Sequence, residues 1–273
     1  MILHYGRLGS GPPLIILHGL YGSGDNWLSV ARGLSDEHEV FLVDQRNHGR
    51  SFHSEVHDYP SMADDLTRLM DHLELSRATL LGHSMGGKTA MRFAVSNPSR
   101  VSGLIIADIS PRTYNSPTTD RQQQDFHYQV LKILSGIRLK DVRLFGEADR
   151  LLAPALPDKR LRQFILKNLG RSPDGHLAWK LNLPALLSNL NALMSGMEDV
   201  VLAGITLTGF PVLFIRGDQS PYIRDEDIRM IRVLFPLAQV TTLKNAGHWL
   251  HAEQPARFIA VVKQFLTRYS DVP

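Results

Sequence analysis

The chain has 273 residues, of which 43% are hydrophobic and 21% are charged, and this composition suits a soluble protein with one large core. It contains no cysteine, which excludes disulfides, thiolate metal sites and a cysteine nucleophile. The 30 basic and 27 acidic residues are scattered and leave a net charge of only +3, so no nucleic-acid partner is expected.

The longest apolar run near the N-terminus, Leu14–Leu17, is far too short to span a bilayer. No basic segment precedes an apolar stretch in the manner of a signal peptide. We therefore expect a cytoplasmic protein without a membrane span.

Short apolar runs alternate with stretches of helical spacing along much of the chain. The runs are Pro13–Leu17, Val40–Val43, Ala78–Leu81, Val101–Ala107, Pro211–Ile215 and Val240–Leu243. This alternation is typical of an α/β protein with a mostly parallel sheet and helices on both faces. The segment Leu3–Gly6 is expected to add an antiparallel edge.

The loop His18–Gly22 directly follows the first predicted strand of the parallel sheet. In sheets of this kind, a backbone N–H of such a loop faces the nucleophile. We therefore predict that the N–H of Leu20 forms part of an oxyanion hole. His18 is expected to brace the loop by hydrogen bonding, and Tyr21 is expected to shape the substrate pocket.

The strongest catalytic signal is the sequence GHSMGG, which begins at Gly82 directly after the apolar run Ala78–Leu81. It contains a G-x-S-x-G motif, which places a serine at a sharp turn between a strand and a helix, where the glycines prevent collisions with neighbouring chain. The helix that follows directs free N–H groups and its positive end toward the serine. We predict Ser84 as the nucleophile and the N–H of Met85 as the second oxyanion donor, with His83 pointing away from the nucleophile.

The alternation breaks between residues 111 and 209, where helical patterns follow one another without strands between them. We predict that residues 1–110 and 210–273 form the core and that residues 111–209 form an inserted helical cap, beneath which an acyl chain binds. The basic sequence KRLR, which begins at Lys159, is expected to be a solvated helix face. Two apolar stripes in this segment are Leu161, Phe164, Ile165 and Leu169, and Leu183, Leu186, Leu187, Leu190 and Met194.

A general base is expected in the loop after the last predicted strand, where the sequence NAGHWLH begins at Asn245. His248 follows a glycine at the start of this loop, which suits an imidazole turned toward Ser84. We predict His248 as the base. His251 is expected in the following turn or bound to backbone groups, and Trp249 is expected to shape the substrate pocket.

Four motifs together resemble those of the α/β-hydrolase family, and they extend from one end of the chain to the other. They are HG-x-x-G at His18, D-x-R-x-H-G-x-S at Asp44, GHSMGG at Gly82 and AGHW at Ala246. The resemblance implies a sheet of about eight strands, an inserted helical cap, and a serine, an acid and a histidine in that order along the chain. The chemistry of such a site requires no metal or organic cofactor.

Three aspartates are candidates for the acid that orients the histidine. In most members of the family the acid follows the penultimate strand in a pattern like G-x-x-D, and here Ser220 occupies that position, two residues after Asp218. Asp149 matches the G-x-x-D pattern in sequence, three residues after Gly146, but it falls inside the predicted cap without a buried strand before it. Asp108 instead ends a strong apolar run, next to the strand that carries Ser84.

We favour Asp108 over Asp218 as the acid. A branch of the family that resembles small bacterial esterases and acyl-CoA thioesterases carries a displaced acid together with an N-S-P-Y-like sequence after the later strand. The sequence QSPY, which begins at Gln219, is similar to that feature. A carboxylate at Asp108 could accept the Nδ1–H of the imidazole and fix its tautomer.

These residues predict hydrolysis of a small-molecule carboxylic ester or acyl thioester through an acyl-enzyme. Two alternatives stay open, namely a C–C bond hydrolase, whose related proteins also carry G-x-S-M-G-G, and a non-catalytic ligand receptor on the same fold. Haloalkane and epoxide hydrolases are disfavoured because they use Asp where this chain has Ser84.

Overall fold

The predicted strands pair edge to edge into one sheet in a computed structural model that describes residues 1–114, 121–172 and 174–269. The order is β1-β3-β2-β4-β5-β8-β9, with β1 antiparallel to β3 and the other neighbours parallel. The mostly parallel sheet and its antiparallel edge are confirmed, with seven strands in the described part of the chain. The strands are β1 Tyr5–Leu8, β2 Pro13–Leu17, β3 Glu39–Val43, β4 Ala78–His83, β5 Val101–Ala107, β8 Val212–Gly217 and β9 Gln239–Leu243.

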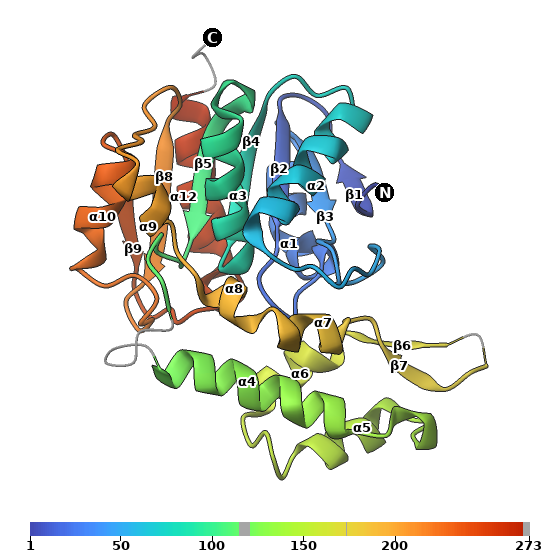
Figure 1. Cartoon of the computed structure of the whole chain (residues 1–273). Helices are drawn as coiled ribbons and strands as arrows, with labels where there is room; N and C mark the ends of the chain where they lie inside the picture. The colour runs from blue at the N-terminus through green and yellow to red at the C-terminus, as the bar shows by residue number, and fades with distance from the viewer. Residues whose placement is uncertain (115–120, 173, 270–273) are drawn as a thin grey trace.

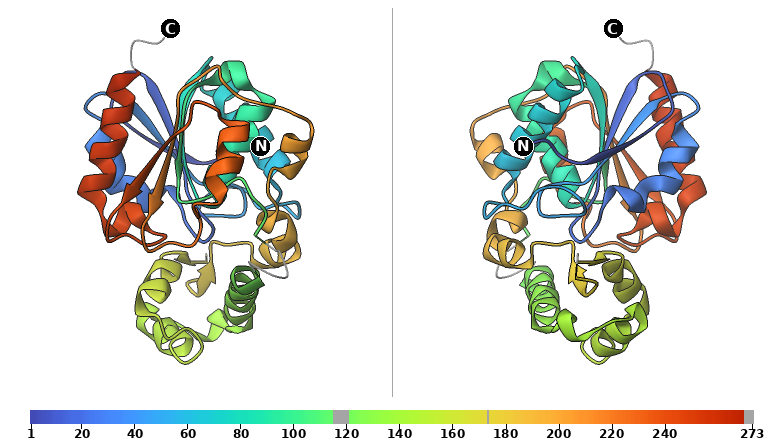
Figure 2. Two further views of the ribbon diagram at one scale, coloured as in Figure 1. Left: turned by 90° about the vertical axis from the view of Figure 1, so that its left-hand side faces the viewer. Right: turned by 90° about the vertical axis from the view of Figure 1, so that its right-hand side faces the viewer.

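Helices cover both faces of this sheet (Figure 2) because successive strand residues point to opposite sides. Leu14 and Ile16 pack with Trp27 and Phe258 on one face, whereas Ile15 packs into a second cluster on the other. No helix in the described ranges is long and apolar enough to cross a bilayer. One face carries α1 Leu28–Leu34 and α12 Pro255–Arg268, and the other carries α2 Tyr59–His72, α3 Met85–Ser96 and α10 Asp227–Leu234; α11 Leu250–Glu253 and the 3-10 turns η1 Gly24–Trp27 and η2 Pro98–Arg100 complete this part.

The chain between β5 and β8 builds a separate layer below the carboxyl ends of the strands (Figure 1). This layer is mostly helical, as predicted, but it also contains an antiparallel hairpin in which Leu169 pairs with Trp179. The prediction of a segment without strands was wrong here, because strands of three residues are too short to show a clear alternation. The elements are α4 Arg121–Gly136, η3 Leu139–Asp141, α5 Phe145–Leu152, α6 Lys159–Leu166, β6 Leu169–Arg171, β7 Leu177–Trp179, α7 Leu183–Ser188, α8 Leu190–Met194 and α9 Glu198–Leu202.

Two details of this segment differ from the sequence prediction. Helix α9 lies beside α10 of the core (Figure 1), and the N–H of Leu207 donates to the carbonyl of Leu234 at 2.7 Å. The last residues of the segment 111–209 therefore run along the core. Arg162 is not solvated but buried, and its Nε lies 2.9 Å from Oδ1 of Asp149.

Candidate active site

The turn between β4 and α3 holds Ser84 in a strained backbone conformation. Ser84 has φ 51° and ψ −119°, which is uncommon for a residue with a side chain. The flanking glycines allow this turn to lie close to its neighbours. A Cβ atom on Gly82 would lie 2.3 Å from the carbonyl oxygen of Gly86, and one on Gly86 would lie 2.2 Å from that of Leu17. Glycine is therefore required at both positions.

Ser84, His248 and Asp108 form a continuous chain of hydrogen bonds, although they come from three separate parts of the sequence. Nε2 of His248 lies 3.1 Å from Oγ of Ser84, and Nδ1 of His248 lies 2.8 Å from Oδ2 of Asp108. Asp108 is fully buried and accepts a second hydrogen bond from the N–H of Gly217 at 3.0 Å. The hydroxyl of Ser220 also donates to Asp108. These bonds hold a carboxylate against the imidazole in an orientation that suits one tautomer.

The other two aspartates lie elsewhere. Oδ1 of Asp218 accepts the N–H of Ala246 at 3.3 Å, and its Oδ2 lies 4.0 Å from Nζ of Lys244. Asp149 lies on α5, paired with Arg162. Because β5 pairs directly with β8, the residue after β5 reaches the space beside the loop that follows β8. This adjacency brings Asp108 to the histidine.

Two aromatic residues contact His248. The ring of Tyr222 stacks on the imidazole at 3.9 Å between ring centroids, with an interplanar angle of 20°. Nε2 of His83 lies 2.8 Å from the backbone carbonyl oxygen of His248. Burial holds the pKa of His83 well below its usual value, so its ring is neutral and can donate from Nε2. The QSPY sequence contained Tyr222, but sequence reasoning did not assign it this contact.

His251 occupies the turn after the base, in α11, as predicted. It stacks on Trp27 with 4.0 Å between ring centroids. Its buried Nδ1 has no hydrogen-bond partner among the residues that the structure describes, so the ring does not bind backbone groups through this atom. Burial lowers the pKa of His251 to about 3.

The loop after β2 is held in place by His18, as predicted. Nδ1 of His18 lies 2.8 Å from the carbonyl oxygen of Gly19, which also accepts the N–H of Gly22 at 2.9 Å. Because the peptide group is planar, fixing this carbonyl makes the N–H of Leu20 point the opposite way. Leu20 and Met85 line the same cavity as Ser84. Their two N–H groups are thus the candidates for an oxyanion hole.

Tyr21 connects this loop to the segment below the sheet. Its backbone has φ 62°, and its N–H donates to Nε2 of His48 at 3.3 Å. Its carbonyl oxygen accepts the side-chain N–H of Asn168 at 2.6 Å, and its hydroxyl lies 3.3 Å from Nδ1 of His127 on α4. The side chain is buried against α4 and is not part of the wall of the Ser84 cavity. Asn168 and His127 gave no signal in the sequence.

The cavity at Ser84 is small, with a volume of about 20 Å³, which is room for about one water molecule. Burial raises the pKa of Tyr59 and Tyr222 in its wall, so both phenols stay protonated. Buried Lys88, which sequence reasoning missed, donates from Nζ to the carbonyl oxygen of Arg112 at 2.9 Å. The wall consists of Leu20, Tyr59, Met85, Lys88, Ile109, Tyr114, His127, Leu193, Met194 and Tyr222.

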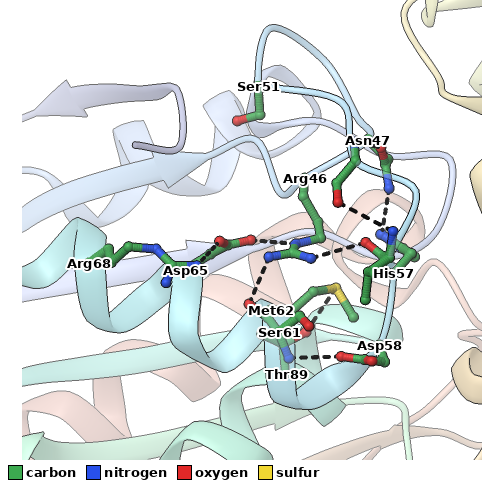
Figure 3. Close-up of polar contacts among 12 residues, drawn as sticks. Arg46, Asn47, Ser51, His57, Asp58, Ser61, Met62, Asp65, Arg68 and Thr89 are labelled. Carbon is green, nitrogen blue, oxygen red and sulfur yellow. Dashed lines mark hydrogen bonds and ion pairs between the residues drawn. The ribbon is translucent and has the colours of Figure 1, made fainter. Parts of the chain in front are cut away.

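The D-x-R-x-H-G-x-S motif that follows β3 builds a buried ion pair (Figure 3). Nε of Arg46 lies 2.5 Å from Oδ2 of Asp65 on α2, and the guanidinium also donates to the carbonyls of Val56 and Ser61 at 3.0 Å. Exposed Arg68 reaches the other oxygen of Asp65 at 2.6 Å. The pair ties the loop that carries His48 to the sheet-covering helix.

We expect Arg46→Ala to lower the free energy of unfolding by about 3–5 kcal/mol, because it leaves the buried carboxylate of Asp65 without its main partner. Arg68→Ala removes the exposed partner of the same carboxylate and should cost about 1 kcal/mol or less. Urea unfolding of both variants measures the difference. Equal losses of unfolding free energy in the two variants would show that the buried ion pair stabilises the fold no more than the exposed one.

Comparison with known proteins agrees with this geometry. A family described as "alpha/beta hydrolase fold" matches residues 12–255. The chain belongs to the α/β-hydrolase family.

Several relatives of this α/β-hydrolase are named as esterases or lipases. It is 36% identical over 266 residues to a protein of Danio rerio named sn-1-specific diacylglycerol lipase ABHD11, covering 94% of this chain and 79% of the relative. It is 32% identical to Esterase YbfF of Escherichia coli, covering 93% and 92% of the two chains. A solved structure described as a marine microorganism esterase is 42% identical, with a TM-score of 0.91 over 97% of this chain and 99% of that one.

Proposed function

We propose that this protein is a serine hydrolase that cleaves carboxylic esters, or acyl thioesters, of small molecules. The observation that carries the proposal is the unbroken hydrogen-bond chain from Asp108 through His248 to Ser84. The esterase and lipase names of the relatives support ester substrates. The thioester substrate is supported by the sequence resemblance alone.

In the proposed reaction, Nε2 of His248 takes the proton of Ser84 as its oxygen attacks the carbonyl carbon. Asp108 stabilises the imidazolium through Nδ1. The N–H groups of Leu20 and Met85 would bind the oxyanion of the tetrahedral intermediate. His248 then passes its proton to the leaving oxygen or sulfur, and the acyl group stays on Ser84 until a water molecule, activated by the same histidine, releases it as the acid.

The segment 111–209 is proposed to act as the cap over this site. His127, Leu193 and Met194 from this segment contribute to the wall of the Ser84 cavity. Because the cavity is so small, it favours short acyl groups over long ones. A cytoplasmic location stays a prediction.

A panel of p-nitrophenyl esters and acyl-CoA thioesters of increasing chain length tests this function. Turnover should be highest for short acyl groups, and Ser84→Ala should lower kcat by a factor on the order of 10⁶. The matched control is Ser76→Ala, because Ser76 is an exposed serine just before β4, whereas Ser84 follows the end of the same strand. Absence of Ser84-dependent release from every ester and acyl-CoA in the panel would contradict the proposal and favour a C–C hydrolase or a receptor.

A further inference from the structure

A second and much larger hollow lies next to the catalytic residues. This groove, which we call the side groove, has a volume of about 670 Å³ and lies between α6 and the loops that follow β8 and β9. Its wall reaches the proposed triad through Trp249, whose ring lies 6.4 Å from that of His248 between centroids. A volume of this size is typical of small-molecule sites. The cavity at Ser84 has room only for a small group, so the other half of a substrate needs a separate place.

The cap wall of the side groove is basic. Arg160, Gln163, Phe164 and Lys167 line it from α6 and its C-terminal residue, and their spacing places them on one helix face. Arg162 of the same helix is paired with a carboxylate at 2.9 Å. In contrast, Arg160 and Lys167 have no carboxylate within ion-pair distance in the described part of the chain. Two exposed cations therefore face the groove.

The rest of the groove suits a ligand that is partly flat and polar. The ring of Trp249 packs on that of Phe164 with 5.6 Å between centroids, which provides an aromatic surface. The opposite wall carries the side-chain amide of Gln219. Glu253 is the one carboxylate among the lining residues, and its Oε2 accepts the N–H of Gly247 at 2.7 Å. The balance of charge in the groove is positive.

We propose that the side groove binds the leaving-group half of the substrate and that this half carries a phosphate, as in a phosphorylated alcohol or thiol. The guanidinium of Arg160 and the ammonium of Lys167 lie about two turns apart on the same face of α6, and either group can bind a phosphate through charge-assisted hydrogen bonds. The ring of Trp249 packs on Phe164 and lies 6.4 Å from the ring of the triad residue His248, so the chain that joins the phosphate to the scissile bond would pass over this aromatic pair. This assignment rests on the proposed ester or thioester hydrolysis.

Matched substrate pairs that differ only in a phosphate test the assignment. Glyceryl monobutyrate is compared with 1-butyrylglycerol 3-phosphate, and S-butyrylpantetheine with S-butyryl-4′-phosphopantetheine. We expect kcat/KM to be about tenfold or more higher for the phosphorylated member of at least one pair, chiefly through a lower KM. The pair that shows the preference identifies whether the leaving group is an alcohol or a thiol. Added salt should weaken the preference, because the cations are exposed.

In the double variant Arg160→Gln/Lys167→Gln, the ratio of the kcat/KM values for the phosphorylated and unphosphorylated members of a pair should fall close to one. The control is Lys159→Gln, which removes an exposed cation of the same helix that does not line the groove and should keep the preference. Neutral esters that are hydrolysed in a Ser84-dependent manner without any preference for phosphate would overturn the groove assignment alone. No Ser84-dependent turnover of either member would instead overturn the proposed function.

Discussion

Replacing Asp108 with Asn should lower kcat for a p-nitrophenyl ester by a factor on the order of 10⁴ while the fold stays intact. The asparagine oxygen can still accept the N–H of Gly217, which now binds Oδ1 of Asp108. Its amide N–H₂ would then take the place of Oδ2, which now contacts the hydroxyl of Ser220 and Nδ1 of His248. The imidazole would shift to the tautomer that carries its proton on Nε2, so it could no longer take the proton of Ser84. Steady-state kinetics and far-UV circular dichroism measure the two effects.

The matched control for this prediction is Asp218→Asn. Asp218 precedes Ser220 by two residues, but its carboxylate contacts Ala246 and Lys244. Its replacement should change kcat by no more than about twofold, as expected for a surface contact of little weight. A large loss of kcat for Asp218→Asn together with a small one for Asp108→Asn would show that the acid follows β8, as in most members of the family, and is not Asp108.

The protein should lose stability steeply as the pH falls below 6.5. Burial lowers the pKa of His57 and His251 to about 3 and that of His127 to about 4. The unfolded chain takes up protons at these residues near pH 6.5, whereas the folded protein does so only at about pH 3–4. These histidines therefore cost no stability above pH 6.5, and the free energy of unfolding falls progressively between pH 6.5 and about pH 3. At pH 5 each histidine should cost about 2 kcal/mol, or roughly 6 kcal/mol together.

Urea unfolding between pH 8 and pH 5 measures this loss, and His251→Phe tests the contribution of one residue. Phenylalanine preserves the stack on Trp27 and removes a buried nitrogen that has no partner in the described part of the chain. The variant should lose about 2 kcal/mol less than the unmodified protein between pH 6.5 and pH 5. Exposed His53 provides the control, since His53→Gln should leave the pH dependence unchanged. Parallel stability curves for His251→Phe and the unmodified protein would contradict the prediction.

The sheet and the position of the serine were predictable because both depend on short stretches of sequence. An apolar run of five residues forms a buried strand in this fold, and a serine between glycines after such a run must occupy a tight turn. The acid was harder to predict, since its position depends on which strands are neighbours. Asp108 was identified from its place at the end of β5 and from the QSPY sequence, and the structure brings it to His248.

Contacts between distant segments could not be predicted. The hydrogen bond from Asn168 to Tyr21 joins residues 147 positions apart, and it forms only because the fold brings the residue after the end of α6 to the loop after β2. Lys88 lies on a helix whose other buried residues are mostly apolar, so its burial is not visible in the helical pattern. Both contacts follow from how the segment 111–209 meets the rest of the chain, which no local pattern encodes.

Backbone atoms closely surround Gly82 and Gly86, which shape the turn, whereas Ser84 between them carries the reactive group. Adding a single methyl group at either glycine would push α3 away from the sheet, whereas the side chain at position 84 points from the tip of the turn into the small cavity. Substitution at the tip can therefore exchange one reactive group for another while the backbone stays as it is. A single substitution at position 84 could therefore change the type of reaction, whereas a substitution of Gly82 or Gly86 would disrupt the turn.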